Sequence, residues 1–333
     1  MGMKRRTFVA GALAAPFLSH AQAGAFADAF GRAAELDQLH ALVIGQKGAI
    51  LRAEAIRGPA LGRPANVKSV SKSIVATLTG IAIDKGALPG VAAPLGSVAP
   101  GIIPRNADPR VAEIRVADLL TMQAGLERTS GANYGGWVSS RNWVADALSR
   151  PFVAEPGARM LYSTGSYHVM GAVLSEVTGT SLLGLARDWL GAPLGIEIPA
   201  WTRDPQGRYM GGNEMALTPE ALWRFGDMIR QGGVWEGREV VSRDWVEAAL
   251  TPRTRSAFSG HDYGYGWFLM TPDGVRVAYG RGYGGQMIYA VPELQLTVAI
   301  TSDPLRPARS RGYAGALHAL LKEAVLPEAA ARL

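Results

Sequence analysis

The feature that most constrains the fold is a change in hydrophobic period near Tyr263. Beyond it, apolar residues recur with a period of two in four stretches, 264–268, 275–279, 286–291 and 296–301. A period of two is typical of β-strands, and short connections between such stretches favour antiparallel pairing. We therefore expect consecutive antiparallel strands at the C-terminal end of the chain.

Strand patterns also occur near the other end, where two apolar runs, 42–44 and 50–51, flank a turn and predict a hairpin. Residues 87–200 instead carry several helical patterns, separated by loops rich in Gly and Pro. Helical spacing at 25–38 and 312–325 predicts terminal helices. The fold class that follows is α+β: an antiparallel sheet flanked by terminal helices, plus an inserted all-helical region. A cleft between the two parts would be the natural site.

Two further helices have clear boundaries in the sequence. One runs from Ser69 to Lys85, with apolar residues at helical spacing, and Gly86 ends it. The other starts at Pro219, with Thr218 as its N-cap. Shorter helical patterns lie at 116–122, 143–148, 166–177 and 182–190.

The first 23 residues read as a targeting signal. Three basic residues, Lys4 to Arg6, precede an apolar run at 9–18 and a small-x-small sequence at 21–23. This order is typical of a signal peptide, and the paired arginines resemble a twin-arginine signal. The alternative is a basic amphipathic first helix. We expect residues 1–23 to be removed and the rest to be periplasmic or secreted in a bacterium; their removal lowers the net charge from +6 to +3.

Composition excludes several function classes. The chain has no cysteine, so disulfides, thiolate metal sites and cysteine nucleophiles are excluded. Its five histidines lie far apart in sequence without metal-ligand spacing, and we expect no metal or other cofactor. No block of Lys and Arg indicates nucleic-acid binding, and no apolar stretch after the signal is long enough to span a bilayer.

Ser69 and Lys72 are the first candidate catalytic pair. They lie three residues apart where an apolar helix opens after a Gly/Pro-rich loop, so both share one helix face. A serine hydroxyl needs a base to act as nucleophile, and a buried lysine with a lowered pKa can serve. The alternative is a chance pair on the surface, since this spacing alone is a weak signal.

Tyr162 is the second candidate, because it lies on a loop just before a predicted helix. A phenol beside a lysine can carry a proton to a leaving group. Taken alone, a core tyrosine with a satisfied hydroxyl is the more common interpretation.

The segment 280–286 matches G-x-G-x-x-G by letter, but a strand follows it rather than a helix, which argues against dinucleotide binding. We interpret it as a Gly-rich strand that lets a substrate approach the backbone. Such a strand could give a second oxyanion N–H, and Arg281 could supply a positive charge. A plain β-bulge hairpin is the alternative.

Taken together and in this order, five segments resemble the serine β-lactamase/penicillin-binding-protein superfamily, in particular its class C-like branch of esterases, D,D-peptidases and 6-aminohexanoate-oligomer hydrolases. The segments are Lys68-Ser69-Val70-Ser71-Lys72-Ser73, Leu119-Leu120-Thr121-Met122-Gln123-Ala124-Gly125-Leu126, Tyr162-Ser163-Thr164, Gly212 to Pro219, and Gly282-Tyr283-Gly284-Gly285-Gln286.

The resemblance implies one β-lactamase-like catalytic domain over residues 24–333, with the helical sub-region at about 87–200 inserted. It implies an acyl-enzyme mechanism on a small-molecule or peptide-like carbonyl substrate. Ser69 would attack, Lys72 would be the base, and Tyr162 would protonate the leaving group. The backbone N–H groups of Ser69 and Tyr283 would form the oxyanion hole.

Two positions depart from the family pattern. Thr164 stands where the family has asparagine, which often holds a substrate side chain. Arg281 and Gly282 stand near the place of the family's Lys-Thr-Gly, whose lysine meets the carboxylate of β-lactams. Both departures favour an esterase or amidase over an efficient β-lactamase.

Other classes remain as alternatives: a β-lactamase, a D,D-peptidase, or a non-catalytic penicillin- or peptidoglycan-binding sensor. A Ser-His-Asp hydrolase is disfavoured because the chain has no G-x-S-x-G elbow.

Overall fold

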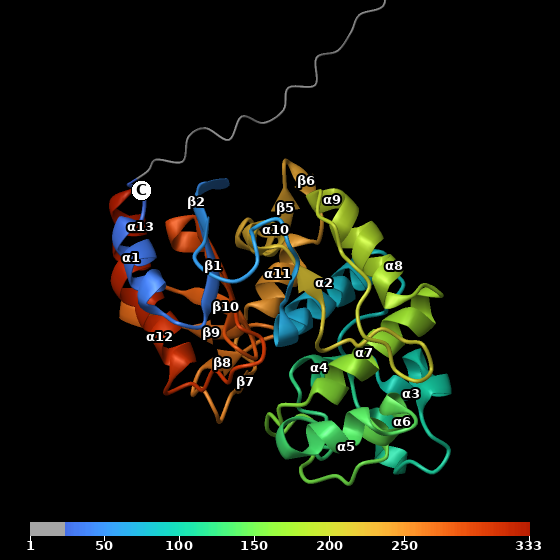
Figure 1. Ribbon diagram of the computed structural model, residues 1–333. Helices are drawn as coiled ribbons and strands as arrows, with labels where there is room; N and C mark the ends of the chain where they lie inside the picture. Colours follow the sequence, from blue (N-terminus) through green and yellow to red (C-terminus); the bar gives the residue numbers. More distant parts are fainter. Residues whose placement is uncertain (1–23) are drawn as a thin grey trace, which may run out of the picture.

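The computed structural model describes residues 24–333, and the predicted signal peptide lies outside the described residues. An eight-stranded sheet forms the centre of the molecule (Figure 1). Its strands are β1 (Leu39–Gln46), β2 (Ala49–Ala55), β7 (Thr254–Arg255), β8 (Asp262–Tyr263), β9 (Phe268–Met270), β10 (Val277–Gly282), β11 (Gln286–Val291) and β12 (Leu296–Ser302).

The two ends of the chain build this sheet together. The strand order is β2-β1-β12-β11-β10-β9-β8-β7, and each pair is antiparallel. The N-terminal hairpin joins the C-terminal meander where β1 pairs with β12, with Val43 opposite Ala299. β11 and β12 are buried along their whole length, which fits strands covered on both faces.

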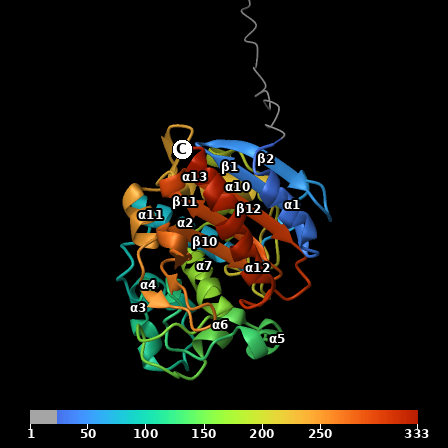
Figure 2. The same cartoon turned by 90° about the vertical axis from the view of Figure 1, so that its left-hand side faces the viewer.

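Helices cover both faces of the sheet (Figures 1 and 2). On one face lie α1 (Ala27–Glu35), α12 (Tyr313–Leu320) and α13 (Leu326–Ala331), the last two joined by a π-helical turn. On the other lie α2 (Ser71–Asp84) and α10 (Pro219–Arg230), with α11 (Arg243–Ala249) packed on α2. The terminal helices are tied together, because the Phe26 N–H donates to Glu328 Oε1 at 2.7 Å.

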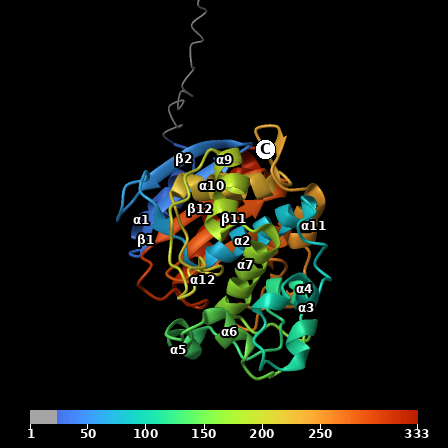
Figure 3. The same cartoon turned by 90° about the vertical axis from the view of Figure 1, so that its right-hand side faces the viewer.

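The middle of the chain forms a helical region beside the sheet (Figure 3). Its helix α7 packs against α2 and also contacts α4, α6 and α8. The helices of this region are α3 (Leu95–Val98), α4 (Val116–Leu120), α5 (Tyr134–Val138), α6 (Trp143–Leu148), α7 (Thr164–Thr178), α8 (Leu182–Ala186) and α9 (Ala192–Leu194). Two small two-stranded sheets complete the fold: β3 (Ala65–Asn66) with β4 (Ala216–Leu217), and β5 (Val234–Trp235) with β6 (Arg238–Glu239).

The predicted α+β class, with a sheet built from both ends of the chain, is therefore confirmed. The N-cap at Thr218 is confirmed as well, since its Oγ1 accepts from the Ala221 N–H at 3.1 Å. Within residues 24–333 no single helix meets the length and hydropathy needed to cross a bilayer, while α7 with the helix after it passes only as a pair bent by 87°.

One predicted strand is wrong. Residues 264–268 form mainly a tight turn between β8 and β9, closed by a hydrogen bond of 2.9 Å from the Gly264 N–H to the Trp267 carbonyl. Gly266 has a φ of 81°, a conformation that glycine adopts readily and a strand does not contain. The apolar residues of this turn are buried for packing, so their alternation mimics a strand pattern.

Candidate active site

Ser69 lies in a single 3₁₀ turn, Lys68–Val70, that leads directly into α2. Lys68 before it has a φ of 50°, an uncommon left-handed conformation for a residue with a side chain. Ser71 holds this turn in place, because its hydroxyl donates to the Lys68 carbonyl at 2.6 Å and accepts from the Met215 N–H at 3.2 Å. The sharp turn leaves Ser69 facing the cavity at the start of the helix.

Lys72 comes one turn later on the same helix face, as its spacing predicts. Its Nζ is 3.0 Å from Ser69 Oγ, and the side chain is 1% exposed. The Gly212 carbonyl accepts from Nζ at 2.6 Å and Thr164 Oγ1 at 3.3 Å. Within residues 24–333 no carboxylate forms an ion pair with this lysine.

Burial without a counter-charge lowers the pKa of Lys72 to about 7. A low-dielectric interior disfavours the ammonium form, and the three oxygen partners offset only part of that cost. At neutral pH, Lys72 is therefore a free amine in a substantial fraction of the molecules. A free amine 3.0 Å from a hydroxyl can accept its proton.

Tyr162 reaches the same hydroxyl from the helical region. Its phenol interacts with the Ser69 side chain, and Lys72 Nζ is 5.0 Å from the centroid of its ring. Burial raises the pKa of Tyr162, while the interaction with Ser69 and the positive charge of Arg281 act in the opposite direction. The phenol is thus protonated at neutral pH and can act as a proton donor beside Ser69.

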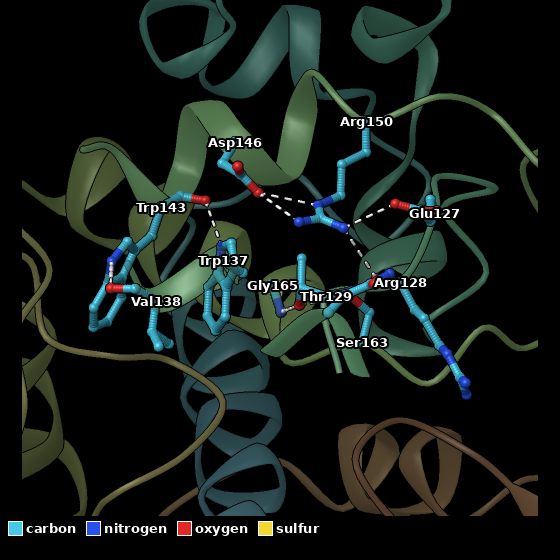
Figure 4. Close-up of polar contacts among 11 residues, drawn as sticks. Glu127, Arg128, Thr129, Trp137, Val138, Trp143, Asp146, Arg150, Ser163 and Gly165 are labelled. Carbon is cyan, nitrogen blue, oxygen red and sulfur yellow. Dashed lines mark hydrogen bonds and ion pairs between the residues drawn. The ribbon is translucent and has the colours of Figure 1, made fainter. Parts of the chain in front are cut away.

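The loop that carries Tyr162 is fixed by Thr129 (Figure 4). The Thr129 N–H donates to Ser163 Oγ at 3.1 Å, and Thr129 Oγ1 accepts from the Gly165 N–H at 2.7 Å. These bonds satisfy backbone and side-chain groups at the start of α7, where the helix has unpaired N–H donors. Tyr162 therefore directly precedes a helix start that hydrogen bonds hold in place.

Arg150 fixes the neighbouring segment in turn. Its Nε and Nη2 both donate to Asp146 Oδ1 at 3.0 Å, and its Nη1 donates to Glu127 Oε2 at 2.9 Å and to the Arg128 carbonyl at 3.4 Å. The Arg128 side chain points away from this network (Figure 4) and lines the cavity. One largely buried guanidinium thus orders the segment that contains both Arg128 and Thr129.

The Gly-rich segment lies against the start of α2. A Cβ on Gly282 would be 2.3 Å from the Val67 carbonyl oxygen, and one on Gly280 would be 2.9 Å from Ser73 Oγ. Only glycine lets β10 approach this closely. Tyr283 follows in the turn before β11 and lines the same cavity as Ser69 and Gly282.

Thr164 and Arg281 also line the cavity, but their hydrogen bonds go to the protein. Thr164 Oγ1 lies between Lys72 Nζ and Ser130 Oγ, at 3.3 and 3.0 Å. The Arg281 guanidinium donates to Ser310 Oγ at 2.8 Å and to the Ala308 carbonyl at 2.6 Å. Both residues thus hold parts of the site in place, a role that the sequence alone does not reveal.

Several residues of the site were not found from the sequence. Lys68 Nζ forms an ion pair with Glu214 at 2.9 Å, and Asn66 Nδ2 donates to the other carboxylate oxygen at 2.6 Å. Ser130 Oγ also accepts a hydrogen bond from the Thr164 N–H at 2.9 Å. No local signal marks these contacts, because they join segments far apart in the chain.

The cavity has a volume of about 650 Å³. In the described part of the chain, no three His, Asp or Glu side chains converge where they could hold a metal ion. The cavity is lined by Lys68, Ser69, Arg128, Ser130, Gly131, Tyr134, Tyr162, Thr164, Asn213, Glu214, Phe258, Phe268, Arg281, Gly282, Tyr283, Pro304, Leu305 and Ala308.

Comparison with known proteins gives consistent findings. A family model described as Beta-lactamase matches residues 64–323. A 6-aminohexanoate-dimer hydrolase from Paenarthrobacter ureafaciens is 27% identical over 152 residues, covering 43% of this chain and only 38% of that relative.

Two solved structures share the fold. One is EstCE1, a hydrolase with promiscuous acyltransferase activity, at a TM-score of 0.72 and 18% identity over 90% of this chain and 98% of that one. The other is an octameric penicillin-binding protein homologue from Pyrococcus abyssi. Its TM-score is 0.68 and its identity 19%, over 89% of this chain and 76% of that one.

Proposed function

Since the chain belongs to the beta-lactamase family of hydrolases, we propose that it cleaves an ester or amide bond through an acyl-enzyme on Ser69. The observation that carries this proposal is the placement of Lys72. A fully buried amine with a pKa of about 7 lies 3.0 Å from the Ser69 hydroxyl. Burying a lysine costs free energy, and this buried lysine lies where a serine nucleophile needs a base.

In the first step, the Lys72 amine takes the Ser69 proton while Oγ bonds to the substrate carbonyl carbon. Negative charge develops on the carbonyl oxygen, where the N–H groups of Ser69 and Tyr283 can stabilise it. The phenol of Tyr162 then donates its proton to the departing oxygen or nitrogen. The Lys72 ammonium returns a proton to the tyrosinate, directly or through Ser69 or a water.

In the second step, a water molecule attacks the acyl-enzyme and loses its proton to the Tyr162–Lys72 pair. The bond between Oγ and the acyl carbon breaks, and the proton passes to Ser69. The acid is released and the resting state is restored. Each proton given up in the first step has thus been returned by the end of the second.

An ester or uncharged amide suits the site better than a β-lactam. Arg281 stands near the place where the family has its carboxylate-binding lysine, and its hydrogen bonds go to Ser310 and Ala308. Thr164 replaces the family asparagine and holds Lys72. A β-lactamase, a D,D-peptidase and a non-catalytic sensor are the other outcomes that the test below separates.

The test compares labelling by a fluorescent fluorophosphonate and a fluorescent penicillin on the native protein, Ser69→Ala and the control Ser175→Ala. Ser175 is a helical serine whose hydroxyl donates to the Gly171 carbonyl, away from the cavity. We expect the native protein and the control to be labelled by the fluorophosphonate, and Ser69→Ala to lose nearly all of this labelling.

Hydrolysis of p-nitrophenyl acetate and of nitrocefin is measured on the same three proteins. We expect Ser69-dependent turnover of the ester to exceed that of nitrocefin. Faster nitrocefin turnover would assign a β-lactamase. Folded native protein that neither probe labels at Ser69 would rule out the acyl-enzyme and favour the sensor.

A further inference from the structure

Large apolar side chains exposed to solvent gather at the mouth of the cavity. Of the five such residues within 24–333, three line it: Phe258 at 46% exposure, Tyr283 at 52% and Leu305 at 82%. The other two, Val153 and Leu333, do not line it. Exposed apolar side chains that cluster at a cavity mark a binding surface more often than a chance grouping. We call Phe258, Tyr283 and Leu305 the apolar rim.

Three separate loops carry the apolar rim, and Arg281 joins two of them. Its guanidinium carbon is 5.5 Å from the centroid of the Phe258 ring, and its N–H groups bond Ser310 Oγ and the Ala308 carbonyl. The rim is therefore assembled before any ligand arrives, which lowers the entropic cost of binding.

The turn with Tyr283 packs directly on the loop with Leu305. A Cβ on Gly284 would be 2.2 Å from the Asp303 carbonyl oxygen, so only glycine permits this approach. Gln286 Nε2 donates to the Ser302 carbonyl at 2.8 Å, and the Ser302 N–H donates back to Gln286 Oε1 at 3.0 Å. These contacts hold the loop with Tyr283 and the loop with Leu305 together.

Phe258 lies against Tyr162, the proton donor of the proposed mechanism. The two rings meet edge to face, with centroids 5.3 Å apart and an interplanar angle of 90°. In the proposed mechanism Tyr162 protonates the leaving group, so that group must lie within hydrogen-bond reach of its hydroxyl. Phe258 contacts the Tyr162 ring and lines the same cavity, so it is a candidate contact for that group.

Resting on the proposed function, we infer that the apolar rim binds the leaving group of the substrate, and that this group is an uncharged, bulky apolar alcohol or amine. The guanidinium nearest to it is hydrogen-bonded to Ser310 and Ala308. These bonds take two of the five guanidinium N–H groups and hold the loop that carries Leu305, so a carboxylate on the leaving group would compete with them for Arg281. An alkyl or aryl group instead gains by covering Phe258 and Leu305.

The experiment uses two matched ester series below their micelle concentrations. One holds the acyl group constant as butyrate and lengthens the alcohol from methyl to butyl to octyl; these alkanols have similar pKa values, so the chemistry stays comparable. The other holds the alcohol constant as methanol and lengthens the acyl chain. The proteins are the native chain, Phe258→Ser, Leu305→Ser and the control Leu333→Ser, which is 57% exposed outside the cavity.

For the native protein and the control, we expect kcat/KM to rise roughly tenfold from the methyl to the octyl alcohol, as burial of apolar surface predicts. Phe258→Ser and Leu305→Ser should each reduce this octyl-to-methyl ratio by roughly threefold or more. Inhibition by free 1-octanol should weaken in parallel in both rim variants. This readout needs no turnover of the variant's poorest substrates.

The inference is overturned if the native kcat/KM does not depend on alcohol length, or if the rim variants lose kcat/KM with acyl length instead. In either case the protein would still be an active hydrolase. A control that loses the ratio as much as the rim variants also overturns it. Absence of Ser69-dependent hydrolysis of every ester in both series contradicts the proposed function itself, so the two failures are distinguishable.

Discussion

Lys72 combines a structural cost with a chemical use. The side chain is buried beside Ser69, with the Gly212 carbonyl and Thr164 as its other partners. The depressed pKa means that folding disfavours its ammonium form. Stability and activity should therefore both depend on the same proton.

Lys72→Met should remove this dependence while keeping most of the side-chain volume. The native pKa of about 7 is below the ordinary 10.5, so the unfolded chain binds more protons between these values. The contribution of Lys72 to the free energy of unfolding of the native protein should thus increase with pH between about 7 and 10.5. Below pH 7 the full cost of the buried ammonium is present, and the variant should then be the more stable protein.

Urea unfolding of both proteins at several pH values gives the difference directly, since other titrating groups cancel to first order. The variant should also lose at least roughly a thousandfold in kcat/KM. In the native protein, kcat/KM should rise with pH through an apparent pKa near 7, as the amine is freed. A difference in stability that does not change with pH would show that Lys72 titrates normally.

At the scale of elements, the start of α2 depends on the close approach of β10. Gly282 packs against Val67 and Lys68, immediately before the nucleophile. The left-handed Lys68 and the hydroxyl of Ser71 complete this junction. A shift of a few tenths of an ångström here would move Ser69 relative to Lys72.

Gly282→Ala should test this junction. The added Cβ would lie 2.3 Å from the Val67 carbonyl oxygen, a backbone atom that cannot rotate away, so β10 and the turn must separate. We expect kcat/KM to fall at least roughly tenfold. Thermal unfolding should show a loss of about 1–3 kcal/mol in stability.

The matched control is Gly31→Ala in α1, where a Cβ meets nothing within 4 Å. It should stabilise the protein slightly, since alanine is the better helix former, and leave kinetics unchanged. Equal kinetics for Gly282→Ala and the native protein would show that the junction tolerates movement.

Element boundaries were predictable where local chemistry sets them. Thr218 and Pro219 begin α10 as expected, and β11 spans the predicted 286–291. The strand expected at 264–268 is mainly a turn, because tertiary packing buries its apolar residues without strand pairing. The two-residue strands β7 and β8 have too few residues to show any period.

At the scale of the whole molecule, the candidate site draws on segments from both the sheet and the helical region. The sequence predicted Ser69, Lys72 and Tyr162 because each lies within a short recognisable pattern. It could not predict that the Gly212 carbonyl accepts from Lys72, or that Ser130 meets Thr164. Those contacts join residues 140 and 34 positions apart, so only the folded chain defines them.

The ion pair of Lys68 and Glu214 is the clearest of these long-range links. It joins the residue before the nucleophile to the segment whose Gly212 carbonyl holds Lys72, and Asn66 completes it. Both side chains are largely buried, at 17% and 23% exposure, so the pair is screened less than a surface pair. It therefore couples the two sides of the site.

A double-mutant cycle with Lys68→Met and Glu214→Gln should reveal this coupling. Because each single change leaves the other, partly buried side chain without its opposite charge, the two together should cost less than their sum, by about 0.5–3 kcal/mol in unfolding free energy. The same non-additivity should appear in kcat/KM, since either change frees the turn before Ser69. The matched control is Arg276 with Glu293, an ion pair of 2.5 Å whose arginine is 81% exposed, and it should show no measurable coupling. Additive effects at Lys68 and Glu214 would mean that the two sides of the site are held independently.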